Sequence, residues 1–463
     1  MPRYLLPLVF FVVSLTGHAA TDPAAERLAQ AVQIRTISHQ DRSLIDYGEF
    51  RRFHDFLRNA YPRVFSELAA ETVNDYSLLI RWPGSDPSLQ PILFTAHFDV
   101  VPVEPGTEGD WLHPPFGGVI AGGRIHGRGT LDDKLGVMSL LEATEQLLSE
   151  GYQPRREVVF ALGHDEEIGG TEGARMIARR MQALGLSFAW MVDEGGFLMS
   201  DSPLLPDKPL ALINVAEKGY LTLTLVAVGD GGHSSNPPKI STIGRLANAL
   251  AQIEANPFAP RLVGPVQAMF ETVAPHLDQP QRLVLENLWL TGSLVANMLA
   301  DDRLTTPLVR TTTALTMFNA GVKENVVPQR AEAKVNFRLL PGDTPEDVVD
   351  HVRNVVDDPL VEISYERWEN VPPVSDHLGP GFAVIEQAVG ESYPDAVVAP
   401  SLLMATTDTR HYIDLADNQY RFRGMMIASE QAQSVHGTNE FVTLESYLNS
   451  IAVARDMLQF GTR

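Results

Sequence analysis

The segment Ile92-Leu-Phe-Thr-Ala-His97-Phe-Asp99 combines an apolar run, typical of a buried strand, with a histidine and an aspartate at its end. Val158–Leu162 and Ala189–Val192 are similar runs that also lead into acidic residues. Between these runs lie stretches of helical periodicity, most clearly Lys134–Glu150 and Thr171–Leu184. Strands that alternate with helices in this way predict an α/β sheet with helices on both of its faces.

The pattern changes near Lys218, where Tyr220–Val228 alternates threonine with aliphatic residues in the manner of a half-exposed strand. A helix, two strands, another helix and a last strand follow, which is the β-α-β-β-α-β order of a ferredoxin-like unit. A mostly helical stretch over residues 257–310 interrupts this order, and the α/β character returns from about Gly379. We therefore predict a small α+β domain inserted into a larger α/β domain. The predicted bounds are 21–217 and 369–463 for the larger domain and 218–368 for the insert.

Composition and charge exclude several classes of protein. The chain has 463 residues, which is enough for two or three domains at roughly 150 residues each. A count of 36 basic against 58 acidic side chains gives a formal net charge of −22, so the surface repels nucleic-acid phosphates and anionic lipid. The absence of cysteine excludes thiol catalysis, disulfides and cysteine-bound zinc. Any metal ion must therefore be held by histidine, aspartate or glutamate.

Residues 1–20, MPRYLLPLVFFVVSLTGHAA, have the pattern of a secretory signal peptide. Arg3 supplies a positive charge, and the apolar run Tyr4–Leu15 is shorter than the ~20 residues that a membrane span needs. Ala19 and Ala20 are small residues suited to cleavage, although an uncleaved anchor is the alternative. Export of a chain without cysteine favours the bacterial periplasm, with no stable membrane span after cleavage.

Five segments place potential metal ligands near predicted strand ends or turns. Ligands of open α/β sheets gather at the carboxyl ends of the strands, so residues from distant segments can meet there. Two histidines and three carboxylates suit a pair of divalent ions, zinc first, with one carboxylate between them. The candidate ligands are His97, Asp132, Glu167, Asp193 and His436.

Each segment taken alone also has a purely structural explanation. His97 could be a packed histidine, the Asp132–Asp133 pair could cap the following helix, and the acidic run at 165–167 could be a solvated loop. Adjacent glutamates repel each other near a core, however, so a cation between them would explain why both are there. One of the two could then bind the metal while its neighbour takes a proton from water.

Several motifs occur together and in order: HFDVVPV, HGRGTLDDK, LGHDEEIGGTEGA, VDEGG, GHSSNPP and VNFRLLPG. With these motifs the sequence resembles the M20 family of zinc-dependent exopeptidases and amidohydrolases. It is most similar to the carboxypeptidase S branch, which includes secreted N-fatty-acyl-amino-acid synthase/hydrolases. The resemblance runs from about Ala24 to the C-terminus. It implies a zinc-exopeptidase-like catalytic domain with an inserted ferredoxin-like α+β lid/dimerisation domain, two Zn²⁺ ions per chain and a homodimer.

The resemblance also implies a role for each candidate ligand. His97 and Asp193 would hold one zinc ion, Glu167 and His436 would hold the other, and Asp132 would bridge the two. The neighbouring acid Glu194 could take the place of Asp193. The peptide bond between Asp132 and Asp133 would be cis.

Three further residues would take part in catalysis by the same resemblance. Glu166 would act as general base and then as general acid, and Asp99 would orient His97, as carboxylates behind metal-bound histidines do. His233 would reach the active site of a partner subunit and polarise the scissile carbonyl. Alternatively, His233 is a loop histidine packed against Pro237.

Asn325, Arg338 and Arg410 resemble residues that lie at the substrate, the first two gripping its carboxylate. The fork of an arginine can bind a carboxylate through two hydrogen bonds. As alternatives, Arg338 could form a salt bridge on a strand surface and Asn325 could be a turn residue.

These roles predict a hydrolase that cleaves the amide bond to a C-terminal amino acid with a free carboxylate, in a small peptide or an N-acyl amino acid. One alternative is a zinc dipeptidase or aminopeptidase, which would need an acidic partner for a free α-amine. Another is a periplasmic peptide-binding protein without catalysis, which would have no use for a base at Glu166.

Overall fold

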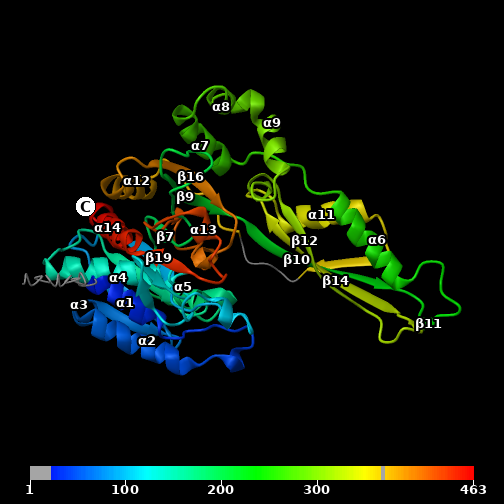
Figure 1. Cartoon of the computed structure of the whole chain (residues 1–463), viewed down its shortest axis with the longest axis horizontal. Coiled ribbons are helices and arrows are strands. Elements are labelled where there is room, and N and C mark those ends of the chain that lie inside the picture. The colour runs from blue at the N-terminus through cyan, green and yellow to red at the C-terminus, as the bar shows by residue number, and fades with distance from the viewer. Residues whose placement is uncertain (1–21, 366–370) are drawn as a thin grey trace, which may run out of the picture.

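Two separate sheets organise the computed structural model, which describes residues 22–365 and 371–463 (Figure 1). The predicted signal peptide lies outside the described residues. None of the described helices is both long and apolar enough to cross a membrane. The α/β class and the additional antiparallel sheet are confirmed, whereas the exact domain bounds stay a prediction.

The central sheet has ten strands, and its middle is formed by β3 (Ile92–His97), β6 (Val158–Gly163) and β7 (Met191–Asp193). β3 pairs in parallel with both β6 and β7. All three strands are buried along their length, which explains their continuous apolar sequence. The strand order is β1-β2-β6-β3-β7-β17-β9-β8-β18, with β16 beside β9. The other strands are β1 (Ala69–Val73), β2 (Ser77–Trp82), β8 (Leu198–Met199), β9 (Leu210–Glu217), β16 (Val397–Leu403), β17 (Gln419–Arg421) and β18 (Met426–Ile427).

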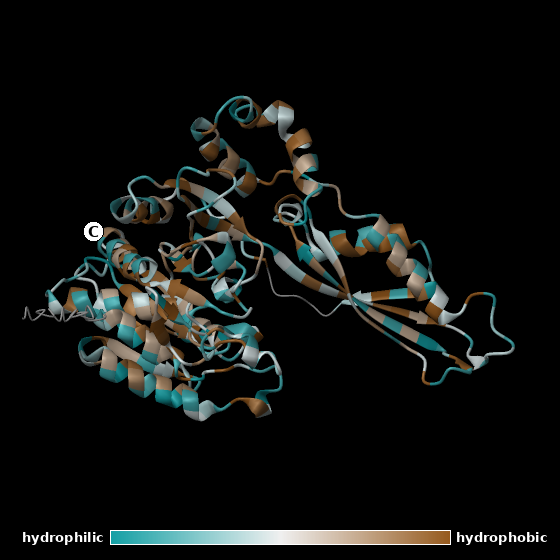
Figure 2. Ribbon diagram, in the orientation of Figure 1, coloured by the Kyte–Doolittle hydropathy of each residue, from teal (hydrophilic) through white to brown (hydrophobic). Residues whose placement is uncertain are grey.

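Helices cover both faces of this sheet, as the alternating pattern predicts. On one face, Phe94 and Phe160 join a core formed mainly with five helices. On the other, Leu93 and Val159 pack with α5 (Ala174–Ala183). Figure 2 shows hydrophobic residues concentrated on the central strands, while the outer helices carry hydrophilic residues as well. The five helices are α1 (Pro23–Val32), α2 (Tyr47–Ala60), α4 (Lys134–Ser149), α12 (Pro380–Ser392) and α14 (Leu444–Gly461).

The second sheet is antiparallel, with strand order β12-β14-β10-β15. Helices α6 (Thr242–Ala255) and α11 (Pro345–Val356) pack against it through one shared core. This is the predicted β-α-β-β-α-β succession, and Tyr220–Val228 belongs to this sheet rather than to the central one. The strands are β10 (Gly219–Val228), β12 (Thr312–Ala320), β14 (Arg330–Leu339) and β15 (Val361–Tyr365).

The stretch that interrupts this succession is helical, as predicted, but it packs elsewhere. Val266 and Phe270 join a core with Leu210 of β9 and Ala399 of β16, both in the central sheet. The interruption therefore returns to the larger sheet before the chain enters β12. Its helices are α7 (Gly264–Val273), η4 (Ala274–His276), α8 (Gln281–Leu285), α9 (Leu288–Ala300) and α10 (Thr306–Val309).

Short elements complete the described chain. β11 (Gly232–His233) pairs with β13 (Val326–Val327) in a ribbon, and a small sheet holds three strands in the order β19-β5-β4. The remaining elements are β4 (Val119–Ala121), β5 (Arg124–His126), β19 (Phe441–Thr443), α3 (Pro62–Glu67), α13 (Ser429–Ala432), η1 (Arg42–Leu44), η2 (Glu108–Asp110), η3 (Glu166–Ile168) and η5 (Asp408–His411).

Candidate metal centre

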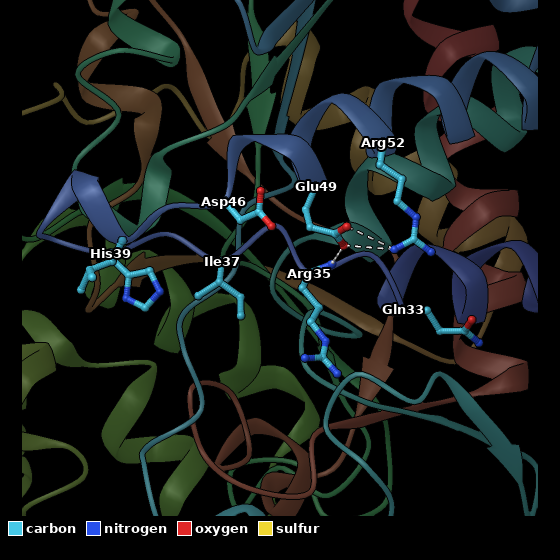
Figure 3. A pocket seen from close by; sticks show the side chains of 8 residues that line it. Gln33, Arg35, Ile37, His39, Asp46, Glu49 and Arg52 are labelled. Carbon is cyan, nitrogen blue, oxygen red and sulfur yellow. Dashed lines mark hydrogen bonds and ion pairs between the residues drawn. The ribbon is translucent and has the colours of Figure 1, made fainter.

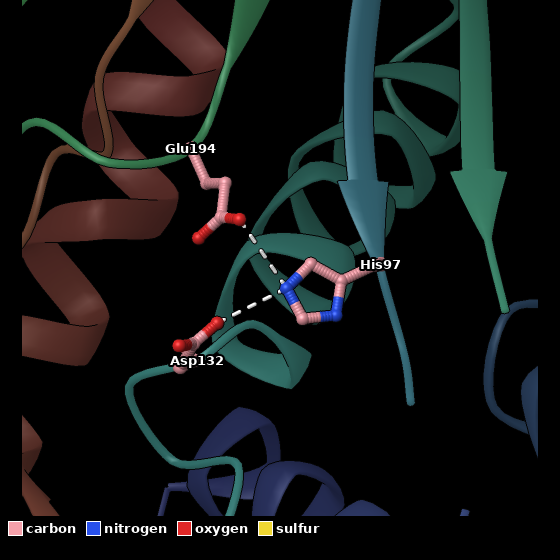
Figure 4. Close-up of side chains that lie close together, drawn as sticks. All are labelled: His97, Asp132 and Glu194. Carbon is pink, nitrogen blue, oxygen red and sulfur yellow. Dashed lines mark hydrogen bonds and ion pairs between the residues drawn. The ribbon is translucent and has the colours of Figure 1, made fainter. Parts of the chain in front are cut away.

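A first cluster of potential ligands forms where β3 and β7 end (Figure 4). His97 is the last residue of β3, Asp132 lies in the turn before α4, and Glu194 follows β7 directly. His97 Nε2 is 3.0 Å from Asp132 Oδ1 and 3.4 Å from Glu194 Oε1. One imidazole nitrogen thus faces two carboxylates, an arrangement that a divalent cation would satisfy.

A second cluster shares Asp132 with the first. His436 Nε2 is 3.0 Å from Asp132 Oδ2 and 3.1 Å from Glu167 Oε2. Asp132 therefore presents one carboxylate oxygen to each histidine. The peptide bond that follows it, Asp132–Asp133, is cis, as the resemblance implied.

The side chain at the end of β7 differs from the expectation. Asp193 points away from His97: its Oδ2 accepts a hydrogen bond from Thr409 Oγ1 (2.9 Å), and its Oδ1 accepts one from the Glu194 backbone N–H (2.9 Å). Successive residues at a strand end project to opposite sides, so only one of the two acids can face His97. The structure brings Glu194, and not Asp193, into the first cluster.

Asp99 connects His97 to the turn that carries the two glutamates. The carboxylate is fully buried and lies 3.3 Å from His97 Nδ1. It accepts hydrogen bonds from the backbone N–H groups of Glu166 (3.1 Å) and Glu167 (3.2 Å) and from Ser38 Oγ (2.6 Å). This position suits the orienting role that the sequence predicts for it.

The electrostatics of the two clusters favour added positive charge. Burial and repulsion from Asp132 raise the pKa of Glu167 to about 7, and the same two effects raise the pKa of Glu194 well above its usual range. Burial alone would also raise the pKa of Asp132, but hydrogen bonds with His436 and His97 lower it below the usual value. Hydrogen bonds with Asp132 and Glu167 raise the pKa of His436 to about 10. Without cations, therefore, some carboxyls or histidines here must hold protons.

Glu166 lies beside the clusters but in neither of them. Burial raises the pKa of its carboxyl well above the usual range, His97 opposes the shift, and Asp408, Glu194 and Glu167 add to it. The position agrees with a base that serves the metal centre without binding to it.

The donor set fits two divalent ions. In each cluster the ligand atoms lie within 4.8 Å of one another. Together the clusters offer two imidazole nitrogens and three carboxylates, with no sulfur. Such nitrogen and oxygen donors are the ones that zinc accepts in catalytic sites.

The other predicted site residues, the catalytic candidate His233 and the three substrate-binding candidates, fall into two groups. His233 ends β11, and Asn325 directly precedes β13. The Ser234 N–H donates to Asn325 O (3.1 Å), and both His233 and Asn325 are exposed. The label β11 in Figure 1 marks the β11–β13 ribbon at the far end of the second sheet from the central sheet. Within one chain these two residues are therefore remote from the clusters.

Arg338 and Arg410 form the other group. Arg338, near the end of β14, stacks over the Tyr220 ring at 4.7 Å, and its buried Nη1 has no hydrogen-bond partner. Burial lowers the pKa of Arg338, and Arg410 lowers it further by charge repulsion. Arg410 lies near Gly169, in the turn that follows Glu166 and Glu167. The two guanidinium groups are thus close enough to repel each other.

A surface pocket elsewhere holds none of the predicted site residues (Figure 3). Its central carboxylate, Glu49, accepts hydrogen bonds from Arg52 Nη1 (3.2 and 3.3 Å) and from the Arg35 backbone N–H (2.8 Å). These donors satisfy the Glu49 carboxylate, so this charge needs no ligand.

Three buried charged residues behind the clusters were not predicted as site residues: Arg128, Arg423 and Glu440. Arg128 and Glu440 stand in the same short segments as Asp132 and His436, which was the available signal. Nothing in the sequence around Arg423 points to the metal centre, because its partner is Asp133, 290 positions away.

Comparison with known proteins adds independent findings. Residues 93–459 match Peptidase family M20/M25/M40. A carboxypeptidase S-like protein of Dictyostelium discoideum is 40% identical over 431 residues, covering 91% of this chain and 82% of that protein. An N-fatty-acyl-amino acid synthase/hydrolase of Mus musculus is 39% identical over 443 residues, covering 94% and 87%. A solved M20 family metallo-carboxypeptidase of Sulfolobus solfataricus shares the fold, with a TM-score of 0.69 at 19% identity over 95% of this chain and 99% of that one.

Proposed function

Since the chain belongs to peptidase family M20/M25/M40, we propose that it is a two-metal hydrolase that cleaves the amide bond to a C-terminal amino acid. Its substrates are N-acyl amino acids or small peptides with a free carboxylate. The observation that carries this proposal is Asp132, whose two oxygens each lie 3.0 Å from a different histidine. The carboxypeptidase S-like and N-fatty-acyl-amino acid synthase/hydrolase relatives support the substrate class.

The five clustered side chains would hold the metal ions. His97, Asp132 and Glu194 would bind one, and Asp132, Glu167 and His436 the other. We propose zinc, because the donors are nitrogen and oxygen atoms at positions close enough for a pair of ions. Such ions, when bound, lower the pKa of a water molecule and polarise the scissile carbonyl.

Glu166 moves the proton in this proposal. Its carboxylate takes a proton from the attacking water and returns it to the nitrogen of the leaving amino acid. The raised pKa supports this use, since a carboxyl that titrates closer to neutral pH can both accept and donate. Asp99 keeps the turn with Glu166 in register with His97 through its two backbone hydrogen bonds.

Arg338 and Arg410 would bind the substrate carboxylate. The unpartnered Nη1 of Arg338 supports this assignment, because a buried N–H without an acceptor is costly and a carboxylate would satisfy it. A bound anion would also relieve the repulsion between the two guanidinium groups. This is the reason for expecting a substrate with a free carboxylate.

The test is a substrate panel. Purified protein with added zinc should release free amino acid from N-acyl amino acids of several chain lengths. Amidation of their carboxylate should lower kcat/KM by roughly 10- to 100-fold, because hydrogen bonds to charged groups contribute about 1.5–3 kcal/mol. Cleavage only of dipeptides with a free amine would favour the dipeptidase alternative. Zinc binding without hydrolysis of any compound would favour a binding protein.

We also propose a homodimer in which His233 of one subunit reaches the metal centre of its partner. The exposed position of His233, remote from the clusters of its own chain, supports this arrangement. Chains with His233→Ala and with Glu166→Gln should each be inactive alone. Co-expression should restore about a quarter of wild-type activity, since half of the dimers are mixed and each of these has one complete site. Full activity of a monomeric species in sedimentation would contradict both the dimer and this use of His233.

A further inference from the structure

A buried ion pair lies directly behind the first cluster. Arg423, two residues after β17, donates from Nε to Asp133 Oδ1 (3.2 Å) and from Nη2 to Asp133 Oδ2 (2.8 Å). The side chains of Arg423 and Asp133 are 6% and 0% exposed. Gly136 makes room for this pair, because a Cβ there would lie 2.4 Å from both Arg423 Nε and Asp133 Oδ1.

The pair ties together the three elements that carry the first cluster. Asp133 follows Asp132 directly, and its Oδ2 accepts from the His97 backbone N–H (3.4 Å). Arg423 Nη2 also donates to Thr95 O in β3 (2.7 Å), and the Arg423 backbone N–H donates to Gly196 O (2.6 Å), two residues after Glu194. Arg423 thus contacts the segments of all three potential ligands without touching a ligand atom.

A second buried ion pair lies behind the other cluster. Arg128 Nη1 donates to Glu440 Oε2 (2.6 Å), and Glu440 Oε1 accepts from the backbone N–H groups of Gly129 (3.0 Å) and Leu131 (2.7 Å). Their side chains are 3% and 0% exposed. Arg128 Nη2 also donates to Gly437 O (2.8 Å), the residue after His436. This pair ties the turn before Asp132 to the loop of His436.

His436 depends on that loop for its position. Its side chain is 52% exposed, whereas that of His97 is 2% exposed, so core packing cannot hold it in place. Its backbone has φ +60°, which is uncommon for a residue other than glycine. The hydrogen bonds from Arg128 to Gly437 and to Glu440 hold the segment that follows His436.

We propose that the two ion pairs are separate positioning devices, Arg423–Asp133 for the first metal ion and Arg128–Glu440 for the second. This inference rests on the proposed function. Well-packed apolar residues would stabilise the fold at least as well as a buried ion pair, so stability alone does not explain two of them. Groups that orient metal ligands from behind are worth roughly 10- to 100-fold in metal affinity. The shared ligand Asp132 lies between the two pairs, so each pair can fix one side of the centre.

The test measures zinc affinity rather than turnover. Metal-free protein is titrated with zinc against a competing chromophoric chelator, for Arg423→Lys and Glu440→Gln. Arg423→Lys keeps the charge but loses the planar guanidinium that makes two hydrogen bonds to Asp133. Glu440→Gln keeps the size of the side chain but loses its charge. Each variant should bind one ion as tightly as wild type and the other about 10- to 100-fold more weakly. If either fails to fold by circular dichroism, Asp133→Asn or Arg128→Lys breaks the same pair from the other side.

Matched controls come from an exposed pair of the same chemistry. Arg455 binds Glu150 through two hydrogen bonds (2.8 and 2.7 Å) at the surface. Arg455→Lys and Glu150→Gln should leave both zinc affinities unchanged.

Double variants assign each effect to a site. Glu194→Gln leaves the second site as the tight one, and adding Glu440→Gln should lower the zinc affinity of that site. Glu167→Gln leaves the first site as the tight one, and adding Glu440→Gln should not change its affinity. Arg423→Lys should behave in the opposite way. The inference is overturned if either variant lowers the zinc affinity of both sites equally or of neither site. It is also overturned if each variant affects the site assigned to the other. If the wild-type protein binds neither zinc nor any other divalent ion, the proposed function on which this inference rests is overturned instead.

Discussion

Replacing Asp132 with alanine should abolish binding of both metal ions and, with it, hydrolysis. Asp132 is the one residue that the two clusters share, with an oxygen 3.0 Å from each histidine. Removing groups that only orient metal ligands costs roughly 10- to 100-fold in affinity, so loss of the shared ligand should cost more than ~100-fold at both sites. Metal analysis after dialysis, together with kcat on the best N-acyl amino acid, measures the effect.

Asp193→Asn is the matched control for this experiment. Asp193 is a buried aspartate at a neighbouring strand end, but its carboxylate binds Thr409 and a backbone N–H instead of facing His97. This variant should keep two ions per chain. Loss of one ion from Asp193→Asn, with no loss from Glu194→Gln, would show that Asp193 is the ligand after all. Two tightly bound ions in Asp132→Ala would contradict the bridging role.

The fold follows from sequence where periodicity is strong. The buried runs at Ile92–His97 and Val158–Gly163 and the helix at Lys134–Ser149 are long enough for their pattern to decide their type. The two-residue strands β11 and β13 are too short to carry any pattern, so the ribbon that holds His233 was not predicted. The helices over 257–310 were predicted, but their packing against β9 and β16 was not, because hydrophobic periodicity does not identify the partner surface.

For the metal centre, the sequence predicts which segments of the chain meet but not every side chain that faces the metal ions. His97 ends β3, and Glu167 lies just after β6, its parallel neighbour in the central sheet. The turn of Asp132 and the loop of His436 join these two strand ends in the clusters. The choice between Asp193 and Glu194 depends on the direction of each side chain where β7 ends, and both residue types are equally suitable. Arg423 and Glu440 contact residues about 300 positions away, and no local pattern reports such a contact.

Replacing Glu166 with glutamine should lower turnover by at least about 10²-fold, because general base catalysis contributes typically 10²–10⁴-fold. Glutamine keeps the size of the side chain and its hydrogen bonds but cannot take the proton from water. The backbone N–H of residue 166 still binds Asp99, so the turn should keep its position. Both metal ions should remain, since the Glu166 carboxylate belongs to neither cluster. Metal content and kcat measured on the same sample test the two statements together.

The adjacent residue should respond in the opposite way. The Glu167 carboxylate lies 3.1 Å from His436 Nε2 in the second cluster, so Glu167→Gln should weaken the binding of one metal ion. Because that defect is one of binding, excess zinc should restore part of the activity, whereas it should not help Glu166→Gln. Both variants keep the backbone and remove one negative charge, so each controls for the other. Loss of zinc in Glu166→Gln with retention in Glu167→Gln would reverse the assignment, and full activity of Glu166→Gln with both ions bound would exclude Glu166 as the base.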